Sequence, residues 1–260
     1  MALDSLFARL CRIPAVEKHL WRMLYNFLAS RPGGEGWEFM NYGYATDQSE
    51  ANPSLRLYDE LARQIDLRGK RLLEVGSGRG GGLAHITRRY VPAKATGCDL
   101  SPQAIDLCRR QHGSLPIEWI AGDAEALPFE PGSFDAVINV ESSHCYPHFE
   151  RFVSEVHRVL APGGHFLWAD FRDSGRVDPV HQTILATGFE EIVWRDITPE
   201  VLRAMQLEEP RKEALLQKHV PAWLRSSFRD FAGMLGSKIH QNFATGAWRY
   251  SLAVMRKPQG

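Results

Sequence analysis

The fold of this chain is decided by one stretch, Leu72-Leu73-Glu74-Val75-Gly76-Ser77-Gly78-Arg79-Gly80-Gly81-Gly82. An apolar run passes into a glycine-dense turn, and the pattern predicts a helix after it. Glycine is favoured where the backbone takes a positive φ or closely approaches a ligand. The carboxylate of Glu74 could accept hydrogen bonds from a cationic or hydroxyl-bearing ligand. The glycines also match G-x-G-x-x-G, so the stretch alone leaves open which nucleotide is bound, or whether it is only a tight turn.

Further carboxylates follow at regular points downstream. Asp99 ends the apolar run Ala95-Thr96-Gly97-Cys98 and precedes Ser101-Pro102, a helix-start signal. Its spacing from the glycine turn suits an acidic residue that holds ribose hydroxyls at the end of a second strand. Asp123 lies in Ala121-Gly122-Asp123-Ala124-Glu125, and residues 133–140 form a further apolar strand. Each carboxylate alone is compatible with a cap or a solvated loop, but their order predicts a nucleotide site.

The rest of the chain alternates predicted strands and helices. From 71 to 140 the alternation predicts parallel βαβ units. We expect a helix at 54–65, another near 149–160, and strands at 165–169, 189–197 and 248–255. Residues 3–30 have apolar side chains near helical spacing and predict two helices that form an N-terminal cap, followed by aromatic residues around Tyr42. Residues 199–243 predict a helical insertion.

Composition limits the classes of protein that this chain can be. It has 260 residues, 44% of them hydrophobic, with 31 basic and 31 acidic residues. This balance gives no general attraction for nucleic acid. Cys11, Cys98, Cys108 and Cys145 have neither metal-ligand spacing nor a disulfide framework, so we expect no metal and a reducing compartment. With no secretory signal and no apolar run of about 20 residues, we expect a cytoplasmic protein without a membrane span. The sequence gives no indication of the oligomeric state.

Taken together, these segments resemble the class I S-adenosylmethionine-dependent methyltransferases that act on small molecules. The resemblance covers about residues 55–172 and is carried by 74–80, 97–101, 122–129, 133–137 and 158–164. Within this family, Asn41-Tyr42-Gly43-Tyr44 and Asn139-Val140-Glu141-Ser142-Ser143-His144 are similar to the branch of sterol, tocopherol and phthiotriolone-type lipid methyltransferases and polyketide tailoring O-methyltransferases. The resemblance implies an enzyme of secondary metabolism.

The resemblance also implies an α/β fold. We expect a Rossmann-like, mostly parallel sheet of seven strands in the order 3-2-1-4-5-7-6, with the last strand antiparallel and helices on both faces. The chain would be a single domain over 1–260: the cap at 1–50, the core at 55–198 and 244–258, and a substrate-binding insertion at 199–243 between the sixth and seventh strands.

The cofactor implied is S-adenosyl-L-methionine, with S-adenosyl-L-homocysteine as the product. Backbone at Gly76 and Gly78 would pass under its amino-acid part, Asp99 would hold the ribose hydroxyls and Asp123 the adenine amino group. The residues expected to bind the cofactor are Glu74, Gly76, Ser77, Gly78, Asp99, Leu100, Gly122, Asp123, Ala124 and Asn139.

His144 is the candidate catalytic base, because it directly follows the fourth strand and an imidazole suits general-base work near neutral pH. A role in packing or in orienting the substrate is the alternative. Tyr42, Tyr44, Glu141 and His240 are the expected substrate-binding residues, with the two tyrosines as a lid. His148 is expected to start a helix.

The expected reaction is methyl transfer to a hydroxyl or enol oxygen of an apolar small molecule, a polyketide or lipid-like natural product. The cap and insertion are rich in apolar and aromatic side chains and lack basic clusters: Trp37, Phe39, Met205, Leu207, Trp223, Phe228, Phe231 and Met234. Two alternatives remain: methylation of carbon on a quinone or olefin, and a non-methylating cyclase that keeps the cofactor site.

Overall fold

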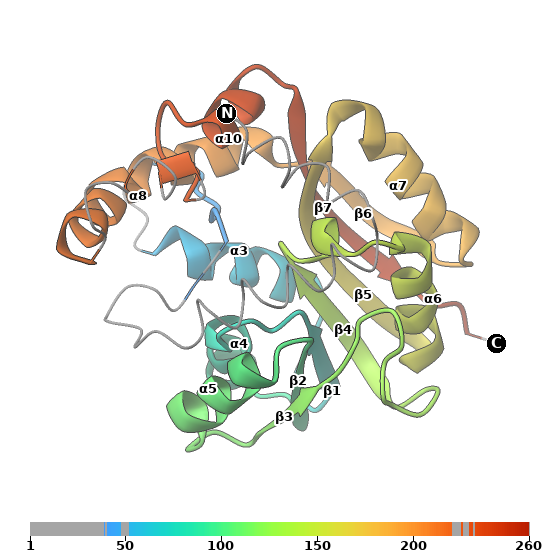
Figure 1. Ribbon diagram of the computed structural model, residues 1–260. Coiled ribbons are helices and arrows are strands. Elements are labelled where there is room, and N and C mark those ends of the chain that lie inside the picture. Colours follow the sequence, from blue (N-terminus) through green and yellow to red (C-terminus); the bar gives the residue numbers. More distant parts are fainter. Residues whose placement is uncertain are drawn as a thin grey trace.

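The computed structural model describes Phe39, residues 41–47 and 52–219, Arg225, and residues 229–230 and 232–259 (Figure 1). Its first described helix is α3 (Pro53–Ala62), for which Asn52 is the N-cap, its side chain accepting a hydrogen bond from the Leu55 N–H. The elements that follow are β1 (Arg71–Val75), α4 (Gly81–Tyr90), β2 (Lys94–Asp99), α5 (Pro102–His112), β3 (Ile117–Ala121), β4 (Phe134–Val140), η1 (Ser143–Cys145), α6 (Phe149–Val159), β5 (Leu160–Asp173), α7 (Ser174–Ala186), β6 (Glu190–Asp196), α8 (Thr198–His219), α10 (Lys238–Ala244) and β7 (Trp248–Arg256).

The strands form one seven-stranded sheet in the order β3-β2-β1-β4-β5-β7-β6. Strands β1 to β5 pair in parallel, and β7 lies antiparallel between β5 and β6. The predicted strand order and the antiparallel last strand are therefore confirmed. Strand order reverses between β1 and β4, so the carboxyl ends of these two strands border the crevice where open α/β sheets bind ligands.

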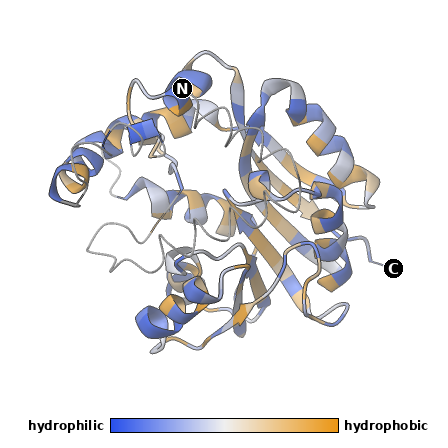
Figure 2. Cartoon of the chain, in the orientation of Figure 1, coloured by the Kyte–Doolittle hydropathy of each residue, from blue (hydrophilic) through white to orange (hydrophobic). Residues whose placement is uncertain are grey.

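Both faces of the sheet are buried, as the continuous apolar runs predict for parallel strands. Figure 2 shows the strands as the most hydrophobic part of the molecule. Neighbouring residues on one strand belong to different buried clusters: Leu72 to the cluster with residues of α3, α4 and α8, and Leu73 to the cluster with residues of α6 and α7. The same alternation holds for Phe166 and Leu167 of β5. Each such side chain contributes roughly 1.5–3 kcal/mol by leaving water, so the sheet is a rigid platform for the site.

Strand β5 is longer than the sequence predicts. We expected a strand over 165–169 after a turn at Pro162-Gly163-Gly164, but β5 runs from Leu160 to Asp173. At its start Leu160 pairs with Phe134, and the register then shifts to His165 opposite Ala136. At its end β5 continues because β7 pairs with it as far as Asp173 opposite Trp248. This extension places Asp170 inside the sheet.

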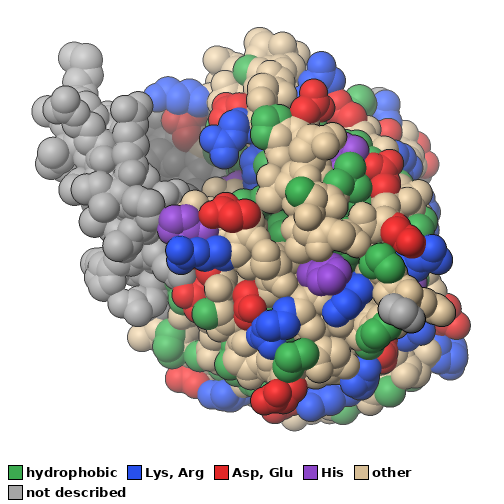
Figure 3. All heavy atoms as spheres, turned by 90° about the vertical axis from the view of Figure 1, so that its right-hand side faces the viewer, with side chains coloured by type: hydrophobic (Ala, Val, Ile, Leu, Met, Phe, Trp, Pro, Cys, Tyr) green, Lys and Arg blue, Asp and Glu red, His purple; other side chains and the backbone are tan. Residues whose placement is uncertain are grey.

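The predicted insertion contains two described helices, α8 and α10, which pack on β7. The short segment 41–47 lies between α3 and α8, because the Tyr44 N–H donates to the Pro53 carbonyl and the Ala45 N–H to the Glu200 carbonyl. The predicted N-terminal cap lies outside the described residues apart from this segment and Phe39. No helix in the described part of the chain is long and apolar enough to cross a membrane. Figure 3 shows acidic and basic side chains interspersed on the face that includes α6 and α7.

Candidate active site

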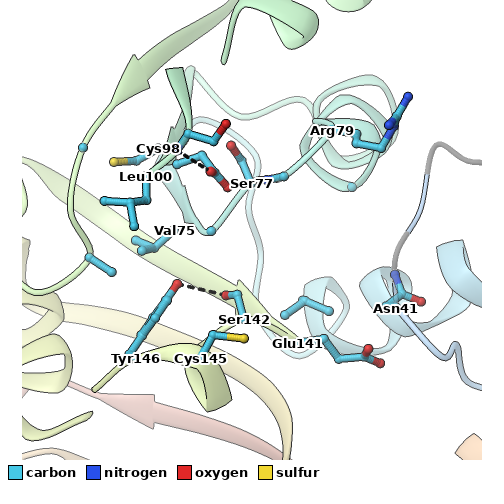
Figure 4. Close-up of a pocket in the computed structure, with 18 of the residues that line it drawn as sticks. Asn41, Val75, Ser77, Arg79, Cys98, Leu100, Glu141, Ser142, Cys145 and Tyr146 are labelled. Carbon is cyan, nitrogen blue, oxygen red and sulfur yellow. Dashed lines mark hydrogen bonds between the residues drawn. The ribbon is translucent and has the colours of Figure 1, made fainter. Parts of the chain in front are cut away.

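A cavity opens at the carboxyl ends of β1, β2 and β4, where strand order reverses (Figure 4). It encloses about 1020 Å³ when the space at its open mouth is included. Its walls come from the glycine turn, the ends of β2 and β3, the segment after β4, and the segment that contains Phe39 and Asn41. Nine of the predicted site residues line it: Gly76, Ser77, Gly78, Asp99, Leu100, Gly122, Asp123, Ala124 and Glu141.

The glycine turn requires glycine for two reasons. Gly76 and Gly78 have φ of +73° and +53°, in the left-handed region that glycine enters at little cost. A Cβ on Gly76 would lie 2.3 Å from Ser142 Oγ, so a side chain there would collide with the segment after β4. The turn is thus built to bring backbone close to whatever occupies the cavity.

Asp99 connects the glycine turn to β2. Its Oδ2 accepts a hydrogen bond from the Gly78 N–H at 2.8 Å, and its Oδ1 accepts one from the Ser101 N–H at 2.9 Å. Burial raises the pKa of this carboxyl, and the two backbone donors offset part of that effect. Each oxygen retains acceptor capacity toward the cavity. Asp123 is similarly fixed, because its Oδ1 accepts from the Glu125 N–H at 2.9 Å.

Glu74 lies behind the glycine turn rather than in the cavity wall, and only 1% of it is exposed. The Tyr58 hydroxyl donates to its Oε1 at 2.8 Å, and the Tyr58 ring itself lines the cavity. Burial raises the pKa of Glu74 to about 8, and hydrogen bonds from Tyr58 and the Leu83 N–H only partly oppose this. Glu74 therefore acts on the cavity through its hydrogen bond with Tyr58.

Asn139 also lies outside the cavity wall and joins β4 to β1. Its Nδ2 donates to the Val75 carbonyl at 2.9 Å and to Ser142 Oγ at 2.7 Å. Ser142 in turn accepts from the Tyr146 hydroxyl at 3.0 Å (Figure 4). Ser142 and Tyr146 line the cavity; Ser142 belongs to the segment 139–144 that carries the resemblance, whereas the sequence had not indicated Tyr146.

Glu141 follows β4 directly and takes a φ of +43°, which is strained for a residue with a side chain. Its Oε1 accepts from the Tyr42 N–H at 2.7 Å and from the Tyr250 hydroxyl at 2.9 Å. Burial raises the pKa of Glu141 to about 8, against the effect of these donors. The strained conformation is held by these contacts with two distant segments, 41–47 and β7.

His144 lies on η1, between cavity-lining Ser142 and Cys145, but is not itself part of the cavity wall. Its Nδ1 is 2.7 Å from Asp170 Oδ1, and its backbone N–H donates to Oδ2 at 2.9 Å. The imidazole also packs on the Phe171 ring, with 4.3 Å between centroids. Because an ionised carboxylate only accepts hydrogen bonds, Nδ1 carries a proton, and in the neutral imidazole Nε2 is the nitrogen with the lone pair.

Asp170 was missed by the sequence analysis. Its side chain is fully buried, and the neighbouring His144 and Arg172 charges hold its pKa well below the usual range although burial opposes them. Burial lowers the pKa of His144, but Cys145 and Asp170 raise it more strongly, so the net shift is upward. The predicted strand ended at residue 169, so the sequence did not mark Asp170 as a buried carboxylate that needs a partner.

The remaining predicted residues lie away from the cavity wall. Tyr42 is 8% exposed and packs on Phe171 and Phe243, and Tyr44 is 4% exposed beside Glu60 and Arg195. His240 lies in α10, where its backbone N–H donates to Ser237 Oγ, and it does not line this cavity.

Of the apolar residues expected in the cap and insertion, Met205 and Met234 are core residues. Trp37, Trp223, Phe228 and Phe231 lie outside the described residues, whereas His148 is the N-cap of α6, as expected.

Comparison with known proteins identifies the class to which this fold and site belong. A family described as "Methyltransferase domain" matches residues 73–168. The chain belongs to the class I S-adenosylmethionine-dependent methyltransferases.

Two curated relatives match nearly the whole chain. Phthiotriol/phenolphthiotriol dimycocerosates methyltransferase of Mycobacterium leprae is 39% identical over 253 residues, 94% of each chain. Fatty-acid O-methyltransferase of Mycolicibacterium smegmatis is 38% identical over 253 residues, 94% of this chain and 92% of its own.

Two solved structures share the fold at lower identity. The [4+2]-cyclase SpnF is 21% identical with a TM-score of 0.69, covering 94% of this chain and 97% of its own. Geranyl diphosphate C-methyltransferase of Streptomyces coelicolor, in complex with Mg²⁺, geranyl diphosphate and S-adenosyl-L-homocysteine, is 16% identical with a TM-score of 0.64, covering 93% and 98%.

The cavity fits the cofactor of this family, S-adenosylmethionine. Ser77 lines the cavity, and its Oγ is buried without a hydrogen-bond partner among the described residues, so a ligand with polar groups would satisfy an atom that the protein leaves unpaired. The acidic side chains of Asp99 and Asp123 line the cavity and suit a ligand that carries hydroxyls and an amino group. The described residues contain no cluster of His, Cys, Asp and Glu able to hold a metal ion.

Proposed function

We propose that this enzyme transfers the methyl group of S-adenosylmethionine to a hydroxyl or enol oxygen of an apolar, lipid-like or polyketide-derived molecule, with His144 as the general base. The observation that carries the proposal is the 2.7 Å contact between His144 Nδ1 and the buried carboxylate of Asp170. It fixes the ring and its tautomer beside a cavity suited to the cofactor. An imidazole at the surface without such a partner would have neither a fixed orientation nor a fixed tautomer.

The cofactor would supply a methyl group bonded to a positively charged sulfonium sulfur. When that bond breaks, the rest of the cofactor leaves as a neutral thioether. The residues of the chain position the two reactants and accept a proton. Gly76, Gly78 and Ser77 would hold the amino-acid part, Asp99 the ribose hydroxyls, and Asp123 with Leu100, Gly122 and Ala124 the adenine. Such positioning provides several kcal/mol of the acceleration.

His144 Nε2 would take the acceptor's proton as its oxygen attacks the methyl group. Asp170 keeps Nδ1 protonated, so that Nε2 is the basic nitrogen, and stabilises the imidazolium that forms. Because the net pKa shift of His144 is upward, the base becomes free only as the pH rises above its usual range. A base of this kind contributes roughly 10²- to 10⁴-fold.

The relatives support an acceptor with a long apolar part. One is named for phthiotriol dimycocerosates and the other for fatty acids. They differ in the acceptor oxygen, since a fatty acid is already ionised at neutral pH whereas an alcohol is not. The buried His144–Asp170 pair favours an acceptor that must lose a proton, so we place the acceptor among hydroxyl or enol compounds.

An acceptor panel with ¹³C-methyl-labelled S-adenosylmethionine tests this proposal. A long-chain polyol of the phthiotriol type, a long-chain fatty acid and a prenylated quinol are incubated separately, and the position of the label is determined by NMR. We expect a methoxy carbon on the polyol and one equivalent of S-adenosyl-L-homocysteine per product. A methyl ester alone would contradict the role of His144, label on carbon would indicate C-methylation, and turnover without S-adenosyl-L-homocysteine would indicate a cyclase.

A further inference from the structure

Asp170 is surrounded by more hydrogen-bond donors than the orientation of His144 requires. Its Oδ1 accepts from His144 Nδ1 at 2.7 Å and from the Phe171 N–H at 2.8 Å. Its Oδ2 accepts from the Ser143 hydroxyl at 2.6 Å and from the His144 N–H at 2.9 Å. Arg172 Nη1 lies 3.2 Å from the same oxygen. A second cation therefore shares the carboxylate with His144.

Arg172 is held in place from all sides. Its Nη2 donates to Ser143 Oγ at 2.9 Å and its Nη1 to the Phe171 carbonyl at 2.7 Å. The guanidinium lies over the rings of Phe149 and Trp168, 5.2 and 5.6 Å from their centroids. Only 12% of the side chain is exposed. A guanidinium fixed by directional bonds and cation–π contacts exerts its charge at one defined point.

Ser143 links the two groups. Its hydroxyl donates to Asp170 Oδ2 and accepts from Arg172 Nη2 and from Trp168 Nε1, the last at 2.9 Å. These hydrogen bonds lie in a buried region, since Asp170 is fully buried and Arg172 is 12% exposed. A network of this kind is rigid, and each charge in it acts strongly on the others.

Other charged and titratable groups face His144 from the surrounding elements. Cys145 adjoins it on η1, Glu141 follows β4, and Tyr250 of β7 and Tyr42 both contact Glu141. Lys212 of α8 lies near Glu141 and Tyr42. Among the described residues that face His144, Arg172 is the cation in contact with Asp170.

We propose that Arg172 and Ser143 are positioning residues that partly neutralise Asp170, so that its carboxylate orients His144 but attracts the imidazolium less than an unshared carboxylate would. An isolated buried carboxylate strongly favours the imidazolium, which cannot accept a proton. A carboxylate shared with a guanidinium retains its geometry but attracts the imidazolium less. This inference rests on the proposed role of His144 as base.

The inference is tested on the intact enzyme by NMR titration of the His144 imidazole, which needs no acceptor. The signal is assigned by its absence in His144→Gln. In Arg172→Met we expect the titration midpoint to rise by about one pH unit or more, the range for loss of a nearby charge. Ser143→Ala should raise it by less, and Arg172→Lys should stay near the wild type. Arg249→Met, which removes the exposed ion pair with Asp196, is the matched control and should leave the midpoint unchanged.

The pH dependence of kcat/KM provides a second measurement. It distinguishes failure of the inference about Arg172 from failure of the proposed role of His144. In Arg172→Met the acidic limb of kcat/KM should move to higher pH together with the NMR midpoint. An unchanged midpoint in Arg172→Met and Ser143→Ala would overturn the inference. If Arg172→Met does not fold, the Ser143→Ala titration decides. Full activity of His144→Gln on a hydroxyl acceptor would instead overturn the proposed function.

Discussion

At the scale of single residues, Asp170 carries most of the chemical argument. It lies on β5, 26 positions beyond His144, and it is the acceptor that fixes both the ring and the backbone of that histidine. The fully buried carboxylate keeps its charge because His144 and Arg172 compensate for burial. Replacing the carboxylate by an amide would therefore change the tautomer, the charge and the proton affinity of His144 together.

Asp170→Asn should lower the rate of methyl transfer at its optimum by at least about a hundredfold, because Nε2 is no longer fixed as the basic nitrogen. The acidic limb of the rate profile should also move to lower pH, since Asp170 no longer raises the pKa of His144 against the effect of burial. Asp173→Asn, on the same strand but exposed and bonded to Trp248 Nε1, is the control. An unchanged profile in Asp170→Asn would mean that the pair is not part of the reaction.

Asp99 allows a test of the cofactor site alone. Asp99→Ala should weaken binding of S-adenosylmethionine by about 1.5–3 kcal/mol, because hydrogen bonds to a charged group are lost and the glycine turn loses its anchor at the Gly78 N–H. Calorimetry measures this directly. Asp106→Ala, which removes an exposed carboxylate on α5, should bind as the wild type does. Equal affinities for all three proteins would remove Asp99 from the site.

At the scale of elements, helix α4 ends in a strained conformation. Val91 caps it with φ 50° and ψ 57°, in the left-handed region, and is 50% exposed. A β-branched residue is poorly suited to this region, and the following Pro92 restricts it further. The Val91 carbonyl accepts from the Gly69 N–H, a contact that glycine at 91 would keep.

Val91→Gly should therefore raise the free energy of unfolding by about 1 kcal/mol, since relief of strain of 1–3 kcal/mol exceeds the added entropy of the unfolded chain. Urea unfolding should show a higher midpoint at unchanged slope. Val91→Ala keeps a Cβ in the left-handed region and should gain less. A lower midpoint for Val91→Gly than for Val91→Ala would show that strain at this cap is not the dominant cost.

The sequence predicted the features of the site that depend only on a strand end and the turn directly after it. The glycine turn, Asp99 and Asp123 are each read from a strand end and the turn after it, so their meeting at one edge of the sheet could be derived. Asp170 could not be placed, because the length of β5 depends on pairing with β7, about 80 residues later in the chain. Tyr42 and Tyr44 were expected near substrate. Tyr42 is buried by contacts with Glu141, Phe171 and Phe243, and Tyr44 lies beside Glu60 and Arg195, contacts that no local pattern shows.

At the scale of the whole molecule, two buried carboxyl groups near the site make the free energy of unfolding depend on pH. Burial raises the pKa of Glu74 and of Glu141 to about 8, from a value near 4.5 in the unfolded chain. The folded protein then holds protons that the unfolded chain releases. The resulting stabilisation is fully present below the unfolded pKa and is lost as pH rises through the folded pKa.

The free energy of unfolding of the cofactor-free protein should consequently fall between about pH 5 and pH 8. In Glu74→Gln the fall should be smaller, because the amide does not titrate and can still accept the Tyr58 hydroxyl. Urea unfolding at a series of pH values measures both curves. Parallel curves for the two proteins would show that Glu74 is ionised in the folded state.

The central claim is that His144 accepts the proton of the acceptor while the methyl group moves. The most direct measurement is the single-turnover rate constant for His144→Ala and wild type, with enzyme and labelled S-adenosylmethionine in excess over the hydroxyl acceptor identified by the panel. We predict a loss of at least about a hundredfold in the rate constant across neutral pH, with cofactor affinity unchanged because His144 lies outside the cavity wall. A variant that transfers the methyl group to the hydroxyl at the wild-type rate would contradict the account.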